Sequence, residues 1–116
     1  MNATRHQVRT VRIMKTHDQK PARMIQVRFE GRRTNCTIRF TSLHILLWML
    51  TSNGCEVRTR MEGDSSCYID PTSVTLEAFD AVLEQAEDTG LGDLFHDVSM
   101  VHVLLCAHLG SYEADN

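Results

Sequence analysis

The side chains best suited to covalent chemistry or metal binding are four cysteines and six histidines. The cysteines are spaced by 19, 12 and 39 residues and form no C-x-x-C pair, whereas structural zinc sites usually bring their ligands in close pairs. Two of them also fall on the core-facing side of alternating segments, where a reduced thiol behaves as a small apolar side chain. We therefore expect no bound metal, no cofactor and four free thiols, namely Cys36, Cys55, Cys67 and Cys106.

Three histidines in the C-terminal half, His96, His102 and His108, recur every six residues. On a helix this spacing leaves neighbours about 120° apart, unlike the i, i+4 pair of a helical zinc site. The segment 65–67 offers two serines and a cysteine, but it has neither a nucleophile-elbow nor a phosphate-loop context. We assign no catalytic residue, and an enzyme with a Cys or His centre is the least favoured hypothesis.

Charge is divided sharply along the chain. Residues 1–60 hold all twelve Lys and Arg residues and three acids, which gives +9, whereas residues 61–116 hold twelve acids and no base, which gives −12. Such asymmetry indicates a macromolecular partner, but it is equally consistent with two halves whose fields partly cancel. Self-association, in which the basic half of one copy contacts the acidic half of another, is a third possibility.

Carboxylates recur every three or four residues between positions 77 and 88, opposite an apolar stripe and with no Lys or Arg on the same helix to relieve them, and Asp93 and Asp97 extend the negative field. A row of this kind can stand in for a nucleic-acid backbone, although it could also be a plain solvated surface. The predicted partner-binding acidic face consists of Glu77, Asp80, Glu84, Glu87, Asp88, Asp93 and Asp97.

Arginines form an alternative binding face on the predicted sheet. If the alternating apolar residues face the helices, the arginines share the opposite side, and their guanidinium groups suit phosphate oxygens. We expect no aromatic residue on this face. Proteins that bind single-stranded nucleic acid, by contrast, stack its bases on exposed aromatic side chains. An ordinary solvated sheet face is also possible. The predicted basic face consists of Arg28, Arg32, Arg33, Arg39, Arg58 and Arg60.

Periodicity predicts the elements that position these faces. Two-residue alternation predicts strands at 7–15, 24–29, 35–40 and 55–61, and a short return strand at 67–69. A helix apolar nearly all round is expected from Leu43 to Ser52, with Thr41 or Ser42 as N-cap and Trp48 buried against the sheet. An acidic helix follows at 73–88, with Leu76, Phe79, Leu83 and Ala86 as its apolar stripe. Residues 91–109 also favour a helix, although 98–106 could form a strand.

We therefore predict one α+β domain over 1–116, with an antiparallel sheet of about four strands in the order βββαβ and two C-terminal helices, the helices packed on one face. Its basic β-rich part is 7–61, its acidic helical part is 70–109, and 110–116 is a loose tail. The longest apolar run, 43–50, is interrupted by His44 and is far shorter than the roughly 20 residues of a membrane span. We expect a cytoplasmic location.

The leading functional hypothesis is a non-enzymatic interaction protein whose acidic face binds a nucleic-acid-binding protein or complex. Small inhibitors of nucleic-acid-handling machines, as phages and mobile elements encode, would fit its size and charge. The alternative is direct nucleic-acid binding through the arginine face.

Overall fold

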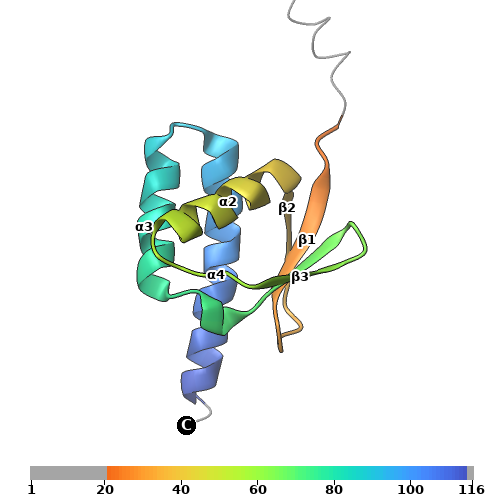
Figure 1. Cartoon of the computed structure of the whole chain (residues 1–116), viewed down its shortest axis with the longest axis vertical. Helices are drawn as coiled ribbons and strands as arrows, with labels where there is room; N and C mark the ends of the chain where they lie inside the picture. Colours follow the sequence, from red (N-terminus) through yellow and green to blue (C-terminus); the bar gives the residue numbers. More distant parts are fainter. Residues whose placement is uncertain (1–20, 115–116) are drawn as a thin grey trace, which may run out of the picture.

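The structure, a computed structural model, describes residues 21–114, with side chains described as far as residue 110. Strand β1 (Met24–Phe29) and strand β2 (Cys36–Arg39) precede helix α2 (Phe40–Ser52), and strands β3 (Thr59–Glu62) and β4 (Ser66–Ile69) follow it (Figure 1). A 3-10 turn (Pro71–Ser73) leads to helices α3 (Leu76–Asp88) and α4 (Gly92–Ala114). The chain is thus an α+β fold in the order ββαββ followed by two helices. The strand predicted at 7–15 lies outside the described residues.

The sheet is mixed, and its strands lie in the order β2-β1-β4-β3. Both hairpins, β1–β2 and β3–β4, are antiparallel as expected, but the central strands β1 and β4 run parallel. The prediction of a wholly antiparallel sheet was therefore wrong. Strands that run parallel need a long connection, and here the chain leaves the first hairpin through α2 before the second hairpin returns to the edge of β1. The short return strand predicted at 67–69 is confirmed as β4, a central strand.

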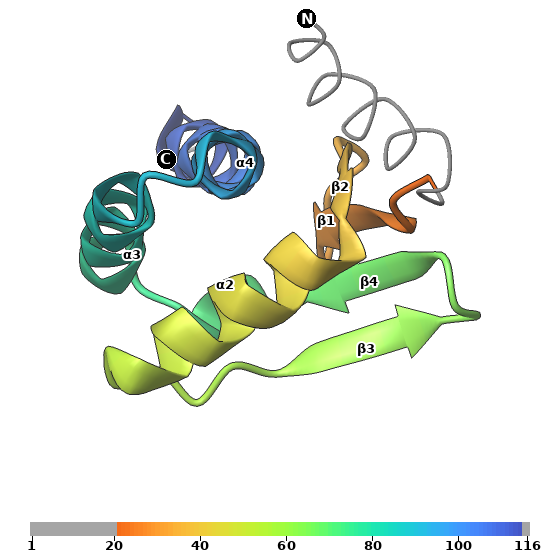
Figure 2. The same cartoon turned by 90° about the horizontal axis from the view of Figure 1, so that it is seen from above.

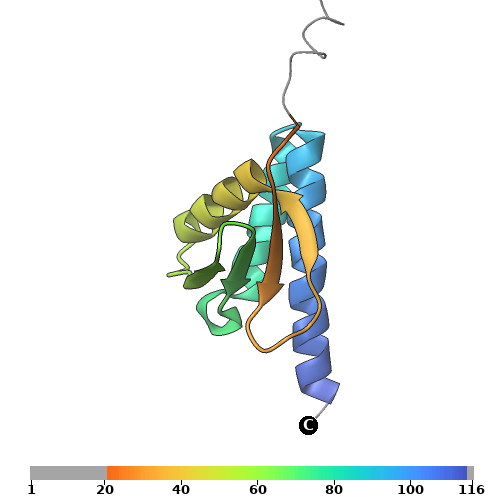
Figure 3. The same cartoon turned by 90° about the vertical axis from the view of Figure 1, so that its right-hand side faces the viewer.

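Strand alternation sets the two faces of the sheet. In β1 the side chains of Ile25, Val27 and Phe29 are buried against the helices, and those between them point the other way. The residues that pair with them, Ile38 of β2 and Cys67 of β4, are buried on the same side. All helices within residues 21–114 lie on this side, and no element of that range covers the opposite face, which we call the open face of the sheet (Figures 2 and 3).

Helix α2 begins at Phe40, earlier than predicted, with Arg39 as its extended N-cap residue and no side-chain cap. The predicted N-cap role of Thr41 or Ser42 was therefore wrong, because both residues lie inside the first turn. The helix ends as predicted at Ser52, and Gly54 adopts the left-handed φ of 94° that follows many helix C-termini.

Trp48 was expected to be buried, and this was wrong, because its side chain is 68% exposed. A helix that is apolar nearly all round can turn only part of its circumference toward the core. In α2 that part is taken by Leu43, Leu46, Met49 and Leu50, and the exposed Trp48 projects from the other side.

The acidic helix α3 begins later than predicted, with the Thr75 hydroxyl accepting a hydrogen bond from the Ala78 amide at 3.0 Å. Phe79 and Ala86 of its predicted stripe are buried, Leu83 is half-buried, and Leu76, in the first turn, is 39% exposed.

Residues 98–106 are helical within α4, which continues through Ala114 into the segment expected to be a tail. Helix α4 packs on β1 and β2, and α3 packs on α4 and α2. No helix in the described part of the chain has the length and apolar character of a membrane span.

Candidate interaction surfaces

The acidic surface that the structure supports is narrower than the predicted one. Glu77, Glu84, Glu87 and Asp88 are all exposed on α3, on the side away from its buried residues. None of the four carboxylates forms an ion pair or hydrogen bond with another residue in the described range 21–110. We call these four residues the acidic face. Within the described side chains, the charge of these four carboxylates is thus not neutralised by a neighbouring residue.

Asp80 also belongs to α3, but its carboxylate is engaged. Its Oδ1 atom lies 2.7 Å from Nε2 of His102 on α4, so the pair joins the two helices. The thiol of Cys106, one turn further along α4, lies 3.8 Å from Nδ1 and 3.9 Å from Nε2 of the same ring. A sulfur nearly equidistant from both nitrogens is not aligned with either as with a catalytic base. We therefore regard this cluster as an interhelical contact with an exposed thiol beside it.

Asp97 does not lie on the acidic surface, so this part of the prediction was wrong. It is 2% exposed, and its Oδ2 accepts hydrogen bonds from the Ser42 hydroxyl at 2.7 Å, the Arg39 guanidinium at 3.0 Å and the Arg39 backbone N–H at 3.2 Å. Asp93 lies 3.5 Å from the same guanidinium. These carboxylates fix the start of α2 to α4, because a helix N-terminus offers unpaired N–H groups and favours negative charge.

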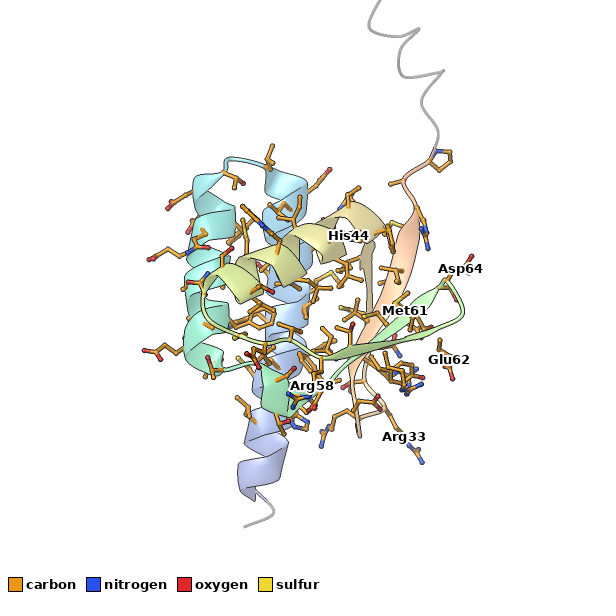
Figure 4. The ribbon with its side chains drawn as sticks, viewed as in Figure 1. Arg33, His44, Arg58, Met61, Glu62 and Asp64 are labelled. Carbon is orange, nitrogen blue, oxygen red and sulfur yellow. The ribbon has the colours of Figure 1, made fainter. Side chains whose placement is uncertain are left out.

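Arg39 is accordingly not available on the open face of the sheet, which corrects the predicted basic face. Its side chain turns toward Asp93 and Asp97 of α4, the helix that covers the other side. Arg33, in the β1–β2 loop, is exposed (Figure 4). Arg32 beside it is partly buried.

Two further arginines of the predicted basic face are held by carboxylates. Arg60 makes a two-pronged contact with Glu30 at 2.8 and 3.3 Å, and the hydrogen bond from Arg60 lowers the pKa of Glu30. Arg58 binds Asp70 at 2.8 and 3.0 Å. The pKa of Asp70 is lowered by hydrogen bonds from the Thr72 hydroxyl and backbone N–H and by Arg58. Internal pairing thus removes much of the excess positive charge from this surface.

An aromatic residue lies on the open face of the sheet, contrary to the prediction. Tyr68 of β4 points outward between the buried Cys67 and Ile69, with the guanidinium carbon of Arg60 4.0 Å from its ring centroid and that of Arg28 at 5.2 Å. Its hydroxyl donates to Glu62 at 3.0 Å. A shallow hollow of about 350 Å³ lies here, lined by Tyr68, Thr59 and the two Arg–carboxylate pairs. The alternation of Cys67, Tyr68 and Ile69 was the signal that could have placed this ring.

The remaining cysteines are buried as small apolar groups. Cys36 and Cys55 face the core as predicted, and Cys67 joins them. Burial, with a smaller contribution from the nearby Asp97 charge, raises the pKa of the Cys36 thiol to about 11. Burial also raises the pKa of Cys67. The thiols of Cys36 and Cys67 are therefore poor nucleophiles at neutral pH, since the thiolate is the reactive form.

Comparison with known proteins finds no matching family model, no similar curated protein and no similar solved structure.

Proposed function

We propose that this protein is a non-enzymatic interaction protein that acts in the cytoplasm and binds the basic surface of a protein partner through the acidic face of α3. The observation that carries the proposal is that Glu77, Glu84, Glu87 and Asp88 are exposed and have no cationic partner within residues 21–110. Like charges three or four residues apart disfavour a helix. A surface that retains them is explained by a positive partner that relieves the repulsion on binding.

The partner that fits this chemistry is a protein that itself binds nucleic acid. Such a protein presents Lys and Arg residues spaced to meet phosphates, and a helix bearing a row of carboxylates can occupy the same groove. The function would then be that of a small competitive inhibitor of the kind that phages and mobile elements encode.

The test is capture of partners from a host lysate with and without nuclease treatment, with the wild-type chain compared with Glu84→Lys/Glu87→Lys. We expect the double variant to lose the captured protein and to keep its fold, because both side chains point into solvent. Binding by the wild type should weaken with salt, since exposed charges are screened beyond roughly 10 Å at 0.1 M.

The matched control is Arg28→Glu/Arg33→Glu, which reverses two charges on the sheet side and leaves Arg39 and its buried partner intact. If the control loses the partner and the helix variant keeps it, the acidic-face proposal is wrong. If nuclease alone removes every partner, the function is nucleic-acid binding.

That second function, direct binding of single-stranded nucleic acid by the open sheet face, is favoured by one observation. Tyr68 supplies an aromatic ring on this face, and Arg28, whose guanidinium carbon lies 5.2 Å from the ring centroid and which pairs with no carboxylate in residues 21–110, supplies a cation for a phosphate. A base would stack on this ring in place of the Arg60 guanidinium, which lies over it at 4.0 Å. Fluorescence anisotropy of a labelled single-stranded oligonucleotide tests it. Binding that Tyr68→Ala weakens and Glu84→Lys/Glu87→Lys leaves unchanged would support this function over the first.

A further inference from the structure

Helix α2 carries a row of aromatic side chains that leads out of the core: Phe40 is partly buried against the core, and His44 and Trp48 are exposed. Phe40, His44 and Trp48 follow one another at four-residue intervals and therefore lie along one ridge of the helix. The rings of Phe40 and His44 meet edge to face with centroids 4.5 Å apart. Trp48 continues the row one turn further and is 68% exposed. We call these three residues the aromatic ridge, and Figure 4 shows its His44 on the side of α2 turned toward the viewer.

The whole of α2 contains no Asp, Glu, Lys or Arg in its thirteen residues. Exposed helix faces usually carry charged residues, whereas the centres of protein interfaces lack charge and are enriched in tryptophan and other aromatics. The exposed residues of this helix are thus all uncharged and include the one tryptophan of the chain; they are Thr41, His44, Trp48, Thr51 and Ser52.

The two ends of the ridge differ in charge. At its start, the guanidinium carbon of Arg23 lies 3.7 Å from the ring centroid of Phe40. At the other end of α2, Asn53 donates from Nδ2 to Gln85 Oε1 of α3 at 3.2 Å, which places Asp88, one turn beyond Gln85, near that end. One end is therefore cationic and the other borders the acidic face.

We infer that α2 is a self-association surface on which the aromatic ridge packs against the same ridge of a second copy, antiparallel and about a two-fold axis. A two-fold contact brings identical patches together, and an uncharged ridge can meet itself without like-charge repulsion. The antiparallel arrangement also places the Arg23 end of each copy beside the acidic end of the other. A different protein bound to this ridge would form only one of these two contacts between a cationic end and an acidic end.

The test is the molar mass of the full chain by sedimentation equilibrium over a range of concentrations, with Trp48 fluorescence recorded in parallel. We expect the mass to rise from 13.2 kDa toward twice that value. The Trp48 emission should move to shorter wavelength over the same range, because the indole leaves water. Trp48→Glu should stay at 13.2 kDa with an unchanged far-UV circular dichroism spectrum.

Val103→Glu is the matched control, because Val103 is 63% exposed on α4 and receives the same apolar-to-acidic change. It should associate like the wild type. Arg23→Glu should raise the dimer Kd several-fold. The substitution places an acidic residue beside the acidic end of the other copy, and the two-fold axis repeats this repulsion at both ends of the interface.

Three results would overturn the inference: a wild-type chain that remains at 13.2 kDa throughout, a Trp48→Glu variant that still associates, or a Val103→Glu variant that dissociates equally. An unchanged Kd for Arg23→Glu would refute the antiparallel arrangement. The assay contains no other protein, so its outcome is independent of the partner binding proposed for α3.

Discussion

Removal of the buried Asp97 carboxylate should destabilise the fold more than any surface charge change. One oxygen, Oδ2, accepts three hydrogen bonds from Ser42 and Arg39, and the side chain is 3% exposed. Asp97→Ala leaves a buried hydroxyl and an N–H group without an acceptor. Truncation of one partner of a buried pair costs about 3–5 kcal/mol. Arg39 is 33% exposed and can regain water, so we expect the lower end, about 3 kcal/mol.

Smaller changes at the same contact should cost less in a defined order. Asp97→Asn keeps the shape and one acceptor oxygen but loses the charge, and we expect about 1–2 kcal/mol. Ser42→Ala removes one donor and should cost about 1 kcal/mol.

Urea unfolding followed by circular dichroism measures these differences. With slopes of about 1–3 kcal/mol/M for small proteins, a loss of 3 kcal/mol moves the midpoint by about 1–3 M. The reasoning is refuted if Asp97→Ala shifts the midpoint no more than Ser42→Ala does. A second readout is the Cys36 thiol, whose raised pKa should fall slightly in Asp97→Ala because the Asp97 charge contributes to it.

Three other predictions concern acid stability, thiol reactivity and the core. Because the folded-state pKa values of Asp70 and Glu30 are lowered, their stabilisation is fully present above their usual values of 3.8 and 4.5 and is lost as pH falls through the folded values. Asp70→Asn with Glu30→Gln should therefore flatten the acid limb of a stability–pH curve, and an unchanged limb would contradict the ion-pair assignment. In the native protein, Ellman's reagent should label Cys106 rapidly and the three buried cysteines only on unfolding, as mass spectrometry can show. In dilute monomer, Phe79→Ala should cost about 3–5 kcal/mol in urea unfolding and Trp48→Ala little, since one ring is buried and the other exposed; similar costs would mean that Trp48 packs in the monomer core.

Local patterns in the sequence determined the position and type of most elements. Two-residue alternation located β1 and β2, and α2 and α3 end at Ser52 and Asp88 as predicted, each followed closely by a left-handed glycine, Gly54 and Gly90. Burial of Cys36 also followed from alternation, whereas Cys55 is buried in the loop before β3, outside any strand, so the strand predicted at 55–61 was wrong for residues 55–58. These features depend on the few residues around each position, so the chain itself encodes them.

Only the tertiary structure decided which strands meet and which charges remain free. The parallel pairing of β1 with β4 depends on where α2 returns the chain, which no local period specifies. Asp97 has the same spacing as the exposed acids of α3, yet it is buried because α4 packs it against the start of α2. Trp48 is exposed because α2 is apolar nearly all round, so its sequence does not specify which side faces the core. The elements that pack against α2 determine which side is buried. Burial and pairing are properties of contacts between distant segments, so they appear only when the segments are brought together.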